Sequence, residues 1–166
     1  MRWVIPLLVV AGLLESVAIK GFVGGGWHIE LTLVLVIGWA ALRGWEEGVL
    51  VGIMGGVIVD LLSAAPFGVN ALRLGLLGLA AGSIISRLAH GSVLLPMAAA
   101  ACGSLLGFVF SVFALQASGL TVVWERSLLL EALPSAVLAA AAMAVGYPLL
   151  RATVRRNESG DQTGES

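Results

Sequence analysis

Charged side chains are scarce in this chain. They make up 11% of its 166 residues, while 59% of the residues are hydrophobic. Globular proteins carry about 25% charged and about 45–50% apolar residues. A chain of this length cannot hide such an excess, because a small domain leaves a large share of its surface exposed. The composition therefore excludes an ordinary globular domain and predicts an integral membrane protein.

Cysteine and blocks of basic residues are also lacking. The single cysteine, Cys102, lies in an apolar run, which excludes an intramolecular disulfide and a cysteine-based zinc site, and we expect it to pack as a small apolar residue. A net charge of −1 without a basic run argues against nucleic acid as a partner. His28 and His90 lie far apart, without metal-ligand spacing. We expect neither a metal nor a cofactor.

The sequence motifs of common enzymes are missing as well. The chain has no G-x-S-x-G nucleophile elbow, no H-E-x-x-H zinc motif and no G-x-x-x-x-G-K-[ST] phosphate loop. Glu15, Glu30 and Glu131 stand near the outer ends of apolar segments, where an interfacial role is favoured over a catalytic one. Glu46 and Glu47 suit the positive end of a helix that begins there. We therefore expect a protein that is not an enzyme.

The sequence does have a series of apolar runs. A membrane-spanning helix needs about 20 mostly apolar residues. Six candidate spans follow one another: Trp3–Ile19, Ile29–Leu42, Glu47–Leu62, Phe67–Leu88, Ser92–Ala117 and Ser127–Leu150. The expected fold is an all-α, polytopic membrane bundle of six transmembrane helices.

The two ends of the chain differ in character. The first run loosely imitates a secretory signal, but Glu15 and the later spans favour a retained anchor. The last ten residues, NESGDQTGES, contain no large apolar side chain. We expect residues 1–152 to form a six-span membrane domain and residues 153–166 to form a polar, disordered cytoplasmic tail.

Basic residues predict the orientation, because the cytoplasmic flanks of membrane spans are enriched in lysine and arginine. If both termini are cytoplasmic, only Lys20 and Arg126 fall at the outer ends of spans. The inner ends then hold Arg2, Arg43, Arg87, Arg151, Arg155 and Arg156. We therefore predict an even number of spans with both termini cytoplasmic.

A line of glycines marks the third span. Gly48, Gly52 and Gly56 are four residues apart and so share one face of a helix. In lipid, such faces allow close approach of two helices. The line therefore predicts a docking surface, either inside a tight bundle or toward a partner protein, although the glycines could also reflect the composition alone. Similar lines are Gly78, Gly82 and Ser86; Gly103, Gly107 and Ser111; and Ala136, Ala140 and Ala144.

Asp60 lies one turn beyond this line. A carboxylate in a membrane span is costly, at about 2.5–3.5 kcal/mol by insertion scales, and so needs a partner. If the hairpin tip lies after Pro66, Asp60 and Arg73 come to the same depth, each about 10 Å from the tip. We predict that Asp60 meets either Arg73 or the backbone and Asn70 amides at the start of the fourth span, where the helix dipole favours negative charge. The alternative is that Arg73 snorkels outward and Asp60 reaches interfacial water.

The stretch GVLVGIMGGVIVDLLSAAPFGVNALRLGLLGLAAG resembles the central signature of the MreD family of bacterial rod shape-determining proteins. That signature combines a glycine, a Gly-Leu-Leu-x-Asp step, a short loop with Pro-x-Gly, and an Ala-Leu pair that opens the next helix. The matching positions are Gly52, Gly56-Val57-Ile58-Val59-Asp60, Pro66-Phe67-Gly68 and Ala71-Leu72. The family often has Pro-Asp where the second span begins, whereas here Ile29 replaces the proline and Glu30 the acid.

The resemblance implies a non-enzymatic scaffold of the cell-wall elongation machinery in the bacterial inner membrane. It implies binding of the bitopic protein MreC, and through it links to the actin-like MreB, the glycosyltransferase RodA and a penicillin-binding transpeptidase. The residues expected to form the structural motif or partner interface are Gly48, Gly52, Gly56, Asp60, Pro66, Gly68, Asn70 and Arg73.

A second functional hypothesis stays open. The small six-span S components of vitamin uptake transporters also dock a partner through small-residue faces, and we expect an S-component-like architecture here. Polar residues of the outer half could line a ligand pocket if they converged. These residues are Trp27, His28, Glu30, Asn70, Arg73, Gln116, Trp124 and Glu131. Against this reading, the first span has only Ala11 and Gly12 as small residues before Glu15.

Overall fold

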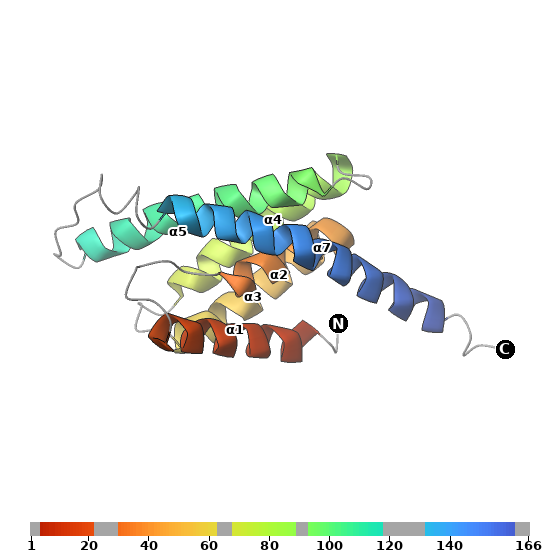
Figure 1. The fold of residues 1–166 in the computed structure, drawn as a ribbon, viewed down its shortest axis with the longest axis horizontal. Coiled ribbons are helices and arrows are strands. Elements are labelled where there is room, and N and C mark those ends of the chain that lie inside the picture. Colours follow the sequence, from red (N-terminus) through yellow and green to blue (C-terminus); the bar gives the residue numbers. More distant parts are fainter. Residues whose placement is uncertain (1–3, 22–29, 63–67, 89–92, 118–131, 162–166) are drawn as a thin grey trace.

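The computed structural model describes residues 4–21, 30–62, 68–88, 93–117 and 132–161. These residues form six α-helices and no strand (Figure 1). The helices are α1 (Val4–Gly21), α2 (Leu31–Arg43), α3 (Trp45–Leu62), α4 (Val69–Leu88), α5 (Leu94–Ala117) and α7 (Leu133–Asp161). The all-α fold is thus confirmed.

Successive helices run back and forth along one long direction (Figure 1). The start of α1 and the end of α7 therefore lie at the same end of the bundle, and the end of α1 and the starts of α2, α4 and α7 lie at the other. We call the second end the polar end, because buried acids gather there.

The central helix is α2, which contacts each of the other five described helices. Its side chains at Leu33, Val36, Ile37 and Ala40 are at most 1% exposed. The helix has only 13 residues and is apolar throughout its middle. A helix that is apolar all round lies either in a protein core or in lipid, and here the other five described helices surround α2.

Two groups of buried side chains hold the other helices on α2. The larger one joins α2, α4, α5 and α7 through residues such as Ile37, Leu74, Ala100 and Met143. The smaller one joins α1 to α2 and α3 through Val4, Leu8, Val36 and Val51. Helix α1 contacts only α2 and α3, and it contacts them less extensively than α7 contacts its own two neighbours, so it is the most peripheral of the described helices.

The outer faces of the bundle are also apolar. Large hydrophobic side chains are exposed on α1, α3, α4, α5 and α7, and α2 has none among them. They are Ile5, Leu7, Val9, Val10, Leu13, Leu14, Trp45, Leu50, Ile53, Leu61, Leu62, Leu72, Leu76, Leu79, Ile84, Leu94, Leu106, Val109, Phe110, Phe113, Leu133, Val137, Val145 and Leu149.

By length and composition, one helix in the described part of the chain is long and apolar enough to cross a membrane. It is the segment Leu133–Val154 of α7. Shorter apolar helices are Val4–Glu15, Leu31–Arg43, Val69–Ile85 and Leu94–Phe110. The prediction of six transmembrane spans and the S-component-like architecture therefore stay predictions.

The helix bounds differ from the expected spans mainly at the carboxyl end. The last span was expected to end at Leu150, but α7 continues to Asp161 and contains Pro148 in its interior. Helix α7 thus extends into residues 153–161, and the division into a membrane domain and a disordered tail stays a prediction. The run Leu149–Arg156 contains leucine, alanine and three arginines, which favour continued helix once a helix exists.

Candidate functional site

The three glycines of α3 face the backbone of α4. A Cβ atom added at Gly52 would lie 2.7 Å from the carbonyl carbon of Leu74 and 2.9 Å from the Cα of Gly75. One added at Gly48 would lie 2.7 Å from the carbonyl oxygen of Gly78. One added at Gly56 would collide with the backbone of α4 at Ala71. Side chains do not fit at any of the three positions.

The contact is reciprocal, because two glycines of α4 face α3. A Cβ at Gly78 would lie 2.7 Å from the carbonyl carbon of Gly48, and one at Gly82 would lie 2.6 Å from the amide nitrogen of Trp45. The α3–α4 contact is the most extensive between any two of the described helices. Small residues let backbones approach closely, which strengthens dispersion contacts along the whole pair.

The glycine line is therefore used by packing inside the chain. Sequence reasoning left open whether it faces a neighbouring helix or a partner protein, and the structure has α4 on it. A partner's helix could reach this face only if α4 moved away. The expectation that Gly48, Gly52 and Gly56 form a partner interface thus stays a prediction. In this structure α4 already covers the face on which they lie.

Asp60 closes the same helix pair at the polar end. Its Oδ2 accepts hydrogen bonds from the backbone N–H groups of Gly68 at 2.9 Å and Ala71 at 3.1 Å. Its Oδ1 accepts from the backbone N–H of Asn70 at 3.1 Å and from the Asn70 side-chain amide at 2.9 Å. Asp60 is only 4% exposed. One carboxylate from α3 therefore satisfies the free amides of the first turn of α4.

The turn before α4 requires a glycine at one position. Gly68 has a φ of +97°, a conformation that side-chain-bearing residues rarely adopt. This conformation lets the Gly68 N–H point back to Asp60. Pro66, the other residue expected in this turn, lies outside the described residues.

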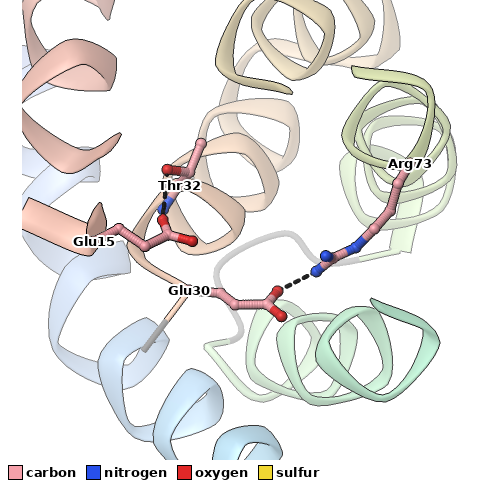
Figure 2. A network of polar contacts seen from close by, with 4 residues as sticks. All are labelled: Glu15, Glu30, Thr32 and Arg73. Atoms are coloured by element: carbon pink, nitrogen blue, oxygen red, sulfur yellow. Dashed lines mark hydrogen bonds and ion pairs between the residues drawn. The ribbon is translucent and has the colours of Figure 1, made fainter. Parts of the chain in front are cut away.

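Arg73 does not meet Asp60. It forms an ion pair with Glu30, the residue that precedes α2 (Figure 2). Of the two partners predicted for Asp60, the amide groups are confirmed and Arg73 is wrong. The depth argument was wrong, because Gly52 lies against Leu74 and Gly56 against Ala71, so Arg73 is level with the stretch between those glycines and more than one turn from Asp60. Arg73 faces Glu30 and α5 instead. Arg73 also does not snorkel outward, since its side chain is 11% exposed.

A second acid, which is half-buried, caps α2. Glu15 of α1 accepts hydrogen bonds from the hydroxyl of Thr32 at 2.7 Å and from its backbone N–H at 3.2 Å (Figure 2). Glu30 stands at the N-cap position of α2 but makes no capping bond of its own. The preceding helix thus supplies the cap, as Asp60 does for α4.

Sequence reasoning missed this role of Glu15, for which it expected an interfacial position. A signal was present in the spacing, because Val4, Leu8, Ala11 and Glu15 share one face of α1. The first three are at most 5% exposed. A carboxylate that continues a buried face needs donors from a neighbouring helix.

The opposite end of the bundle has a smaller polar contact. The indole N–H of Trp39 on α2 donates to Glu47 on α3 at 2.9 Å, and the guanidinium of Arg43 lies 5.8 Å from the centre of the Trp39 ring. The two helices join at Gly44, whose φ is +94°. This contact fixes the α2–α3 hairpin where the chain reverses.

At the polar end, Asp60 and Glu15 bind the amide groups of helix starts and Glu30 binds Arg73. All three acids thus hold one helix against another. Within the described ranges there is no group of three His, Cys, Asp or Glu side chains that could hold a metal ion. His28, His90 and Glu131 lie outside those ranges, as do Trp27 and Trp124. What the described residues build is a bundle whose hairpins are locked by glycine contacts and buried acids.

Comparison with known proteins gives one family. No curated protein and no solved structure matches the chain significantly. The family model for the rod shape-determining protein MreD matches residues 1–156. That match covers nearly the whole chain and includes all of the glycine and aspartate positions described above. The chain therefore belongs to the MreD family of rod shape-determining proteins.

Proposed function

We propose that this protein is a non-enzymatic, multi-pass scaffold of the cell-wall elongation machinery in the bacterial inner membrane. Membership of the MreD family carries a role in rod shape determination, and the family match over residues 1–156 is the observation on which the proposal rests. The finer assignment is the link from an MreC-like bitopic protein to MreB-like actin, RodA and a penicillin-binding transpeptidase.

The surface of the bundle supports the membrane part of the proposal. Large apolar side chains are exposed on all the outer helices, whereas the described acids Glu15, Glu30 and Asp60 are turned inward onto donors. An apolar exterior over a polar-bonded interior suits lipid as the surrounding solvent. The start of α1 and the end of α7 lie at the same end of the bundle (Figure 1). An even number of membrane crossings with both termini cytoplasmic requires this.

The covered glycine faces bear on how a partner could bind. Since α3 and α4 occupy each other's glycines, the partner's single helix would lie on the lipid-facing side of an outer helix. The α3–α4 pair would then serve the partner indirectly, as a stiff support for that face. Lipids would cover the remaining apolar surface.

Co-purification with an MreC-like protein tests this proposal. The full chain is expressed with the partner, and single outward residues are replaced by a bulky one, with Leu76→Trp on α4, Val109→Trp on α5 and Val145→Trp on α7. We expect one of these outward faces to lose the partner while the protein still accumulates. A chain that never retains the partner, in detergent or in nanodiscs, contradicts the proposal.

The neighbouring genes separate this function from a vitamin-uptake S component. Reading frames for an actin-like and an MreC-like protein beside this one agree with the scaffold, whereas ATPase and coupling subunits agree with the transporter. The described polar residues do not favour the transporter, because Glu30 and Arg73 pair with each other and Asn70 binds Asp60.

A further inference from the structure

Arg73 occupies an unusual position in the bundle, between three helices. It belongs to α4, its guanidinium pairs with Glu30 before α2, and it lies against Gly107 of α5. A Cβ added at Gly107 would lie 2.7 Å from the Arg73 Nε and closer still to the rest of the guanidinium. Gly107 thus leaves the space that the guanidinium fills.

A second contact of the same kind lies one turn away. A Cβ added at Gly103 would be 3.5 Å from the Leu77 side chain of α4, and 3.3 Å from those of Leu33 and Ile37 on α2. Arg73 and Leu77 are four residues apart, and so are Gly107 and Gly103. Two side chains of α4 therefore project toward two glycines of α5 in matching steps.

This pair of contacts matters because α4 and α5 otherwise touch little. Their contact is the least extensive among the helix pairs that pack together, although they follow each other in the chain. Helix α7 packs only on α5 and α2. The placement of α5 against α4 therefore depends on few positions.

We infer that Arg73, Glu30 and Gly107 form one lock that sets the register of α5 against α4. The glycine admits the guanidinium, and the glutamate neutralises it at a site where an unpaired charge is costly. A shift of α5 by one turn in one direction would bring Ser111 onto the guanidinium in place of Gly107, and a shift in the other direction would bring Gly103 there and Ala99 onto Leu77. Arg73 is thus a positioning residue. The inference goes beyond the proposed function and does not depend on it.

A neutralisation cycle tests the charge part of the lock. The variants Arg73→Leu and Glu30→Gln are each compared with the double variant in detergent. Each single change leaves one buried charge unpaired, so we expect the Tm to fall by about 10 °C. The double variant leaves no charge, so we expect it to recover most of that loss. The matched controls Arg87→Leu on α4 and Glu46→Gln on α3, both exposed residues, should leave the Tm unchanged.

A substitution at Gly107 tests the steric part. In the natural sequence, Gly107→Ala pushes the guanidinium away and should lower the Tm and the accumulated amount of protein. In the background of Arg73→Leu with Glu30→Gln the same methyl group enters vacated space, so Gly107→Ala should be neutral or stabilising there. Gly146→Ala, where the nearest side chain lies 3.5 Å from the added Cβ, is the control in both backgrounds.

Cysteine crosslinking reports the register itself, which stability alone does not. In a Cys102→Ser background, Leu77→Cys with Gly103→Cys should crosslink strongly, and Leu77→Cys with Ala99→Cys, one turn along α5, weakly. Arg73→Leu should shift yield from the first pair to the second, and adding Glu30→Gln should not restore the first.

Three results would overturn the inference. The first is that the Tm losses of Arg73→Leu and Glu30→Gln add up in the double variant. The second is that Gly107→Ala lowers the Tm as much without the arginine as with it. The third is that Arg73→Leu leaves both crosslinking yields unchanged. All three readouts use the purified protein, so a failure here and a failure of partner binding are distinguishable.

Discussion

At the scale of single residues, the buried acids divide into two kinds. Asp60 and Glu15 bind the amide groups of helix starts, and Glu30 binds a guanidinium. The first two thus rely on the positive end of a helix instead of a cation. This use of backbone amides lets a membrane bundle hold three described carboxylates with one buried arginine.

The cap on α4 predicts the effect of changing Asp60. Asp60→Ala removes the acceptor for four N–H groups at once, so we expect the free energy of unfolding to fall by about 3 kcal/mol. Asp60→Asn keeps one acceptor oxygen but turns an NH2 group toward a donor. Its free energy of unfolding should therefore lie between those of the natural protein and Asp60→Ala. Chemical unfolding in a fixed detergent measures both. Equal stability of Asp60→Ala and the exposed-acid control Glu46→Ala would contradict the capping role.

The cap on α2 gives a coupled pair. Glu15→Ala and Thr32→Val each remove the same hydroxyl–carboxylate hydrogen bond. The double variant should therefore lose less stability than the sum of the single losses, by about 1 kcal/mol. Glu15→Ala should be the more harmful single change, because it also frees the Thr32 N–H. Strict additivity in the cycle would mean that the two side chains do not act together.

At the scale of helices, the α3–α4 pair has the most extensive contact among the described helices. Its glycines contact backbone, which cannot turn away as a side-chain end can. The peripheral α1 differs, since it contacts α2 and α3 through side chains such as Leu8 and leaves one whole face outside. The pair therefore resembles a support on which the other helices are placed.

The backbone contact predicts unusual sensitivity to one methyl group. Gly56→Ala should lower stability by about 2 kcal/mol or more through overpacking, even though alanine is the better helix former by about 1 kcal/mol. Gly12→Ala on α1 should cost less, because its nearest neighbours are the ends of the Ile58 and Leu62 side chains. Thermal unfolding of the two variants side by side measures the difference, and a larger loss for Gly12→Ala would reverse this ranking.

At the scale of the whole molecule, the fold alternates direction and brings both ends of the helical path to one side (Figure 1). The polar end holds the buried Asp60 and the half-buried Glu15 and Glu30. The other end holds Trp39, Arg43 and Glu47. If the six predicted spans cross the membrane with both termini cytoplasmic, the polar end faces the outside.

Accessibility of single cysteines tests this topology. In a Cys102→Ser background, Glu46→Cys and Thr153→Cys should react with a membrane-impermeant maleimide only after the cytoplasmic side is opened. Leu133→Cys, at the start of α7, should react from the outside of intact cells. Labelling of Thr153→Cys and Leu133→Cys from the same side would rule out a crossing by α7.

Part of the candidate site was predictable from local spacing. The four-residue steps of Gly48, Gly52 and Gly56 predicted a side-chain-free face, and the hairpin around Gly68 predicted that Asp60 reaches the amides of Asn70. Both depend on positions along one hairpin, which the chain itself keeps close. The Glu15 cap and the Arg73–Glu30 pair join residues 17 and 43 positions apart, and no local rule brings those together.

The sequence by itself determined the apolar character and the helices, because composition and the length of the apolar runs decide these. Only the tertiary structure decided direction around each helix: that α4 covers the glycines of α3, that α2 is central, and that Arg73 turns to Glu30 and Gly107. The reason is physical. An isolated helix has no preferred neighbour, and which of its faces meets which other helix depends on the packing of all the helices together.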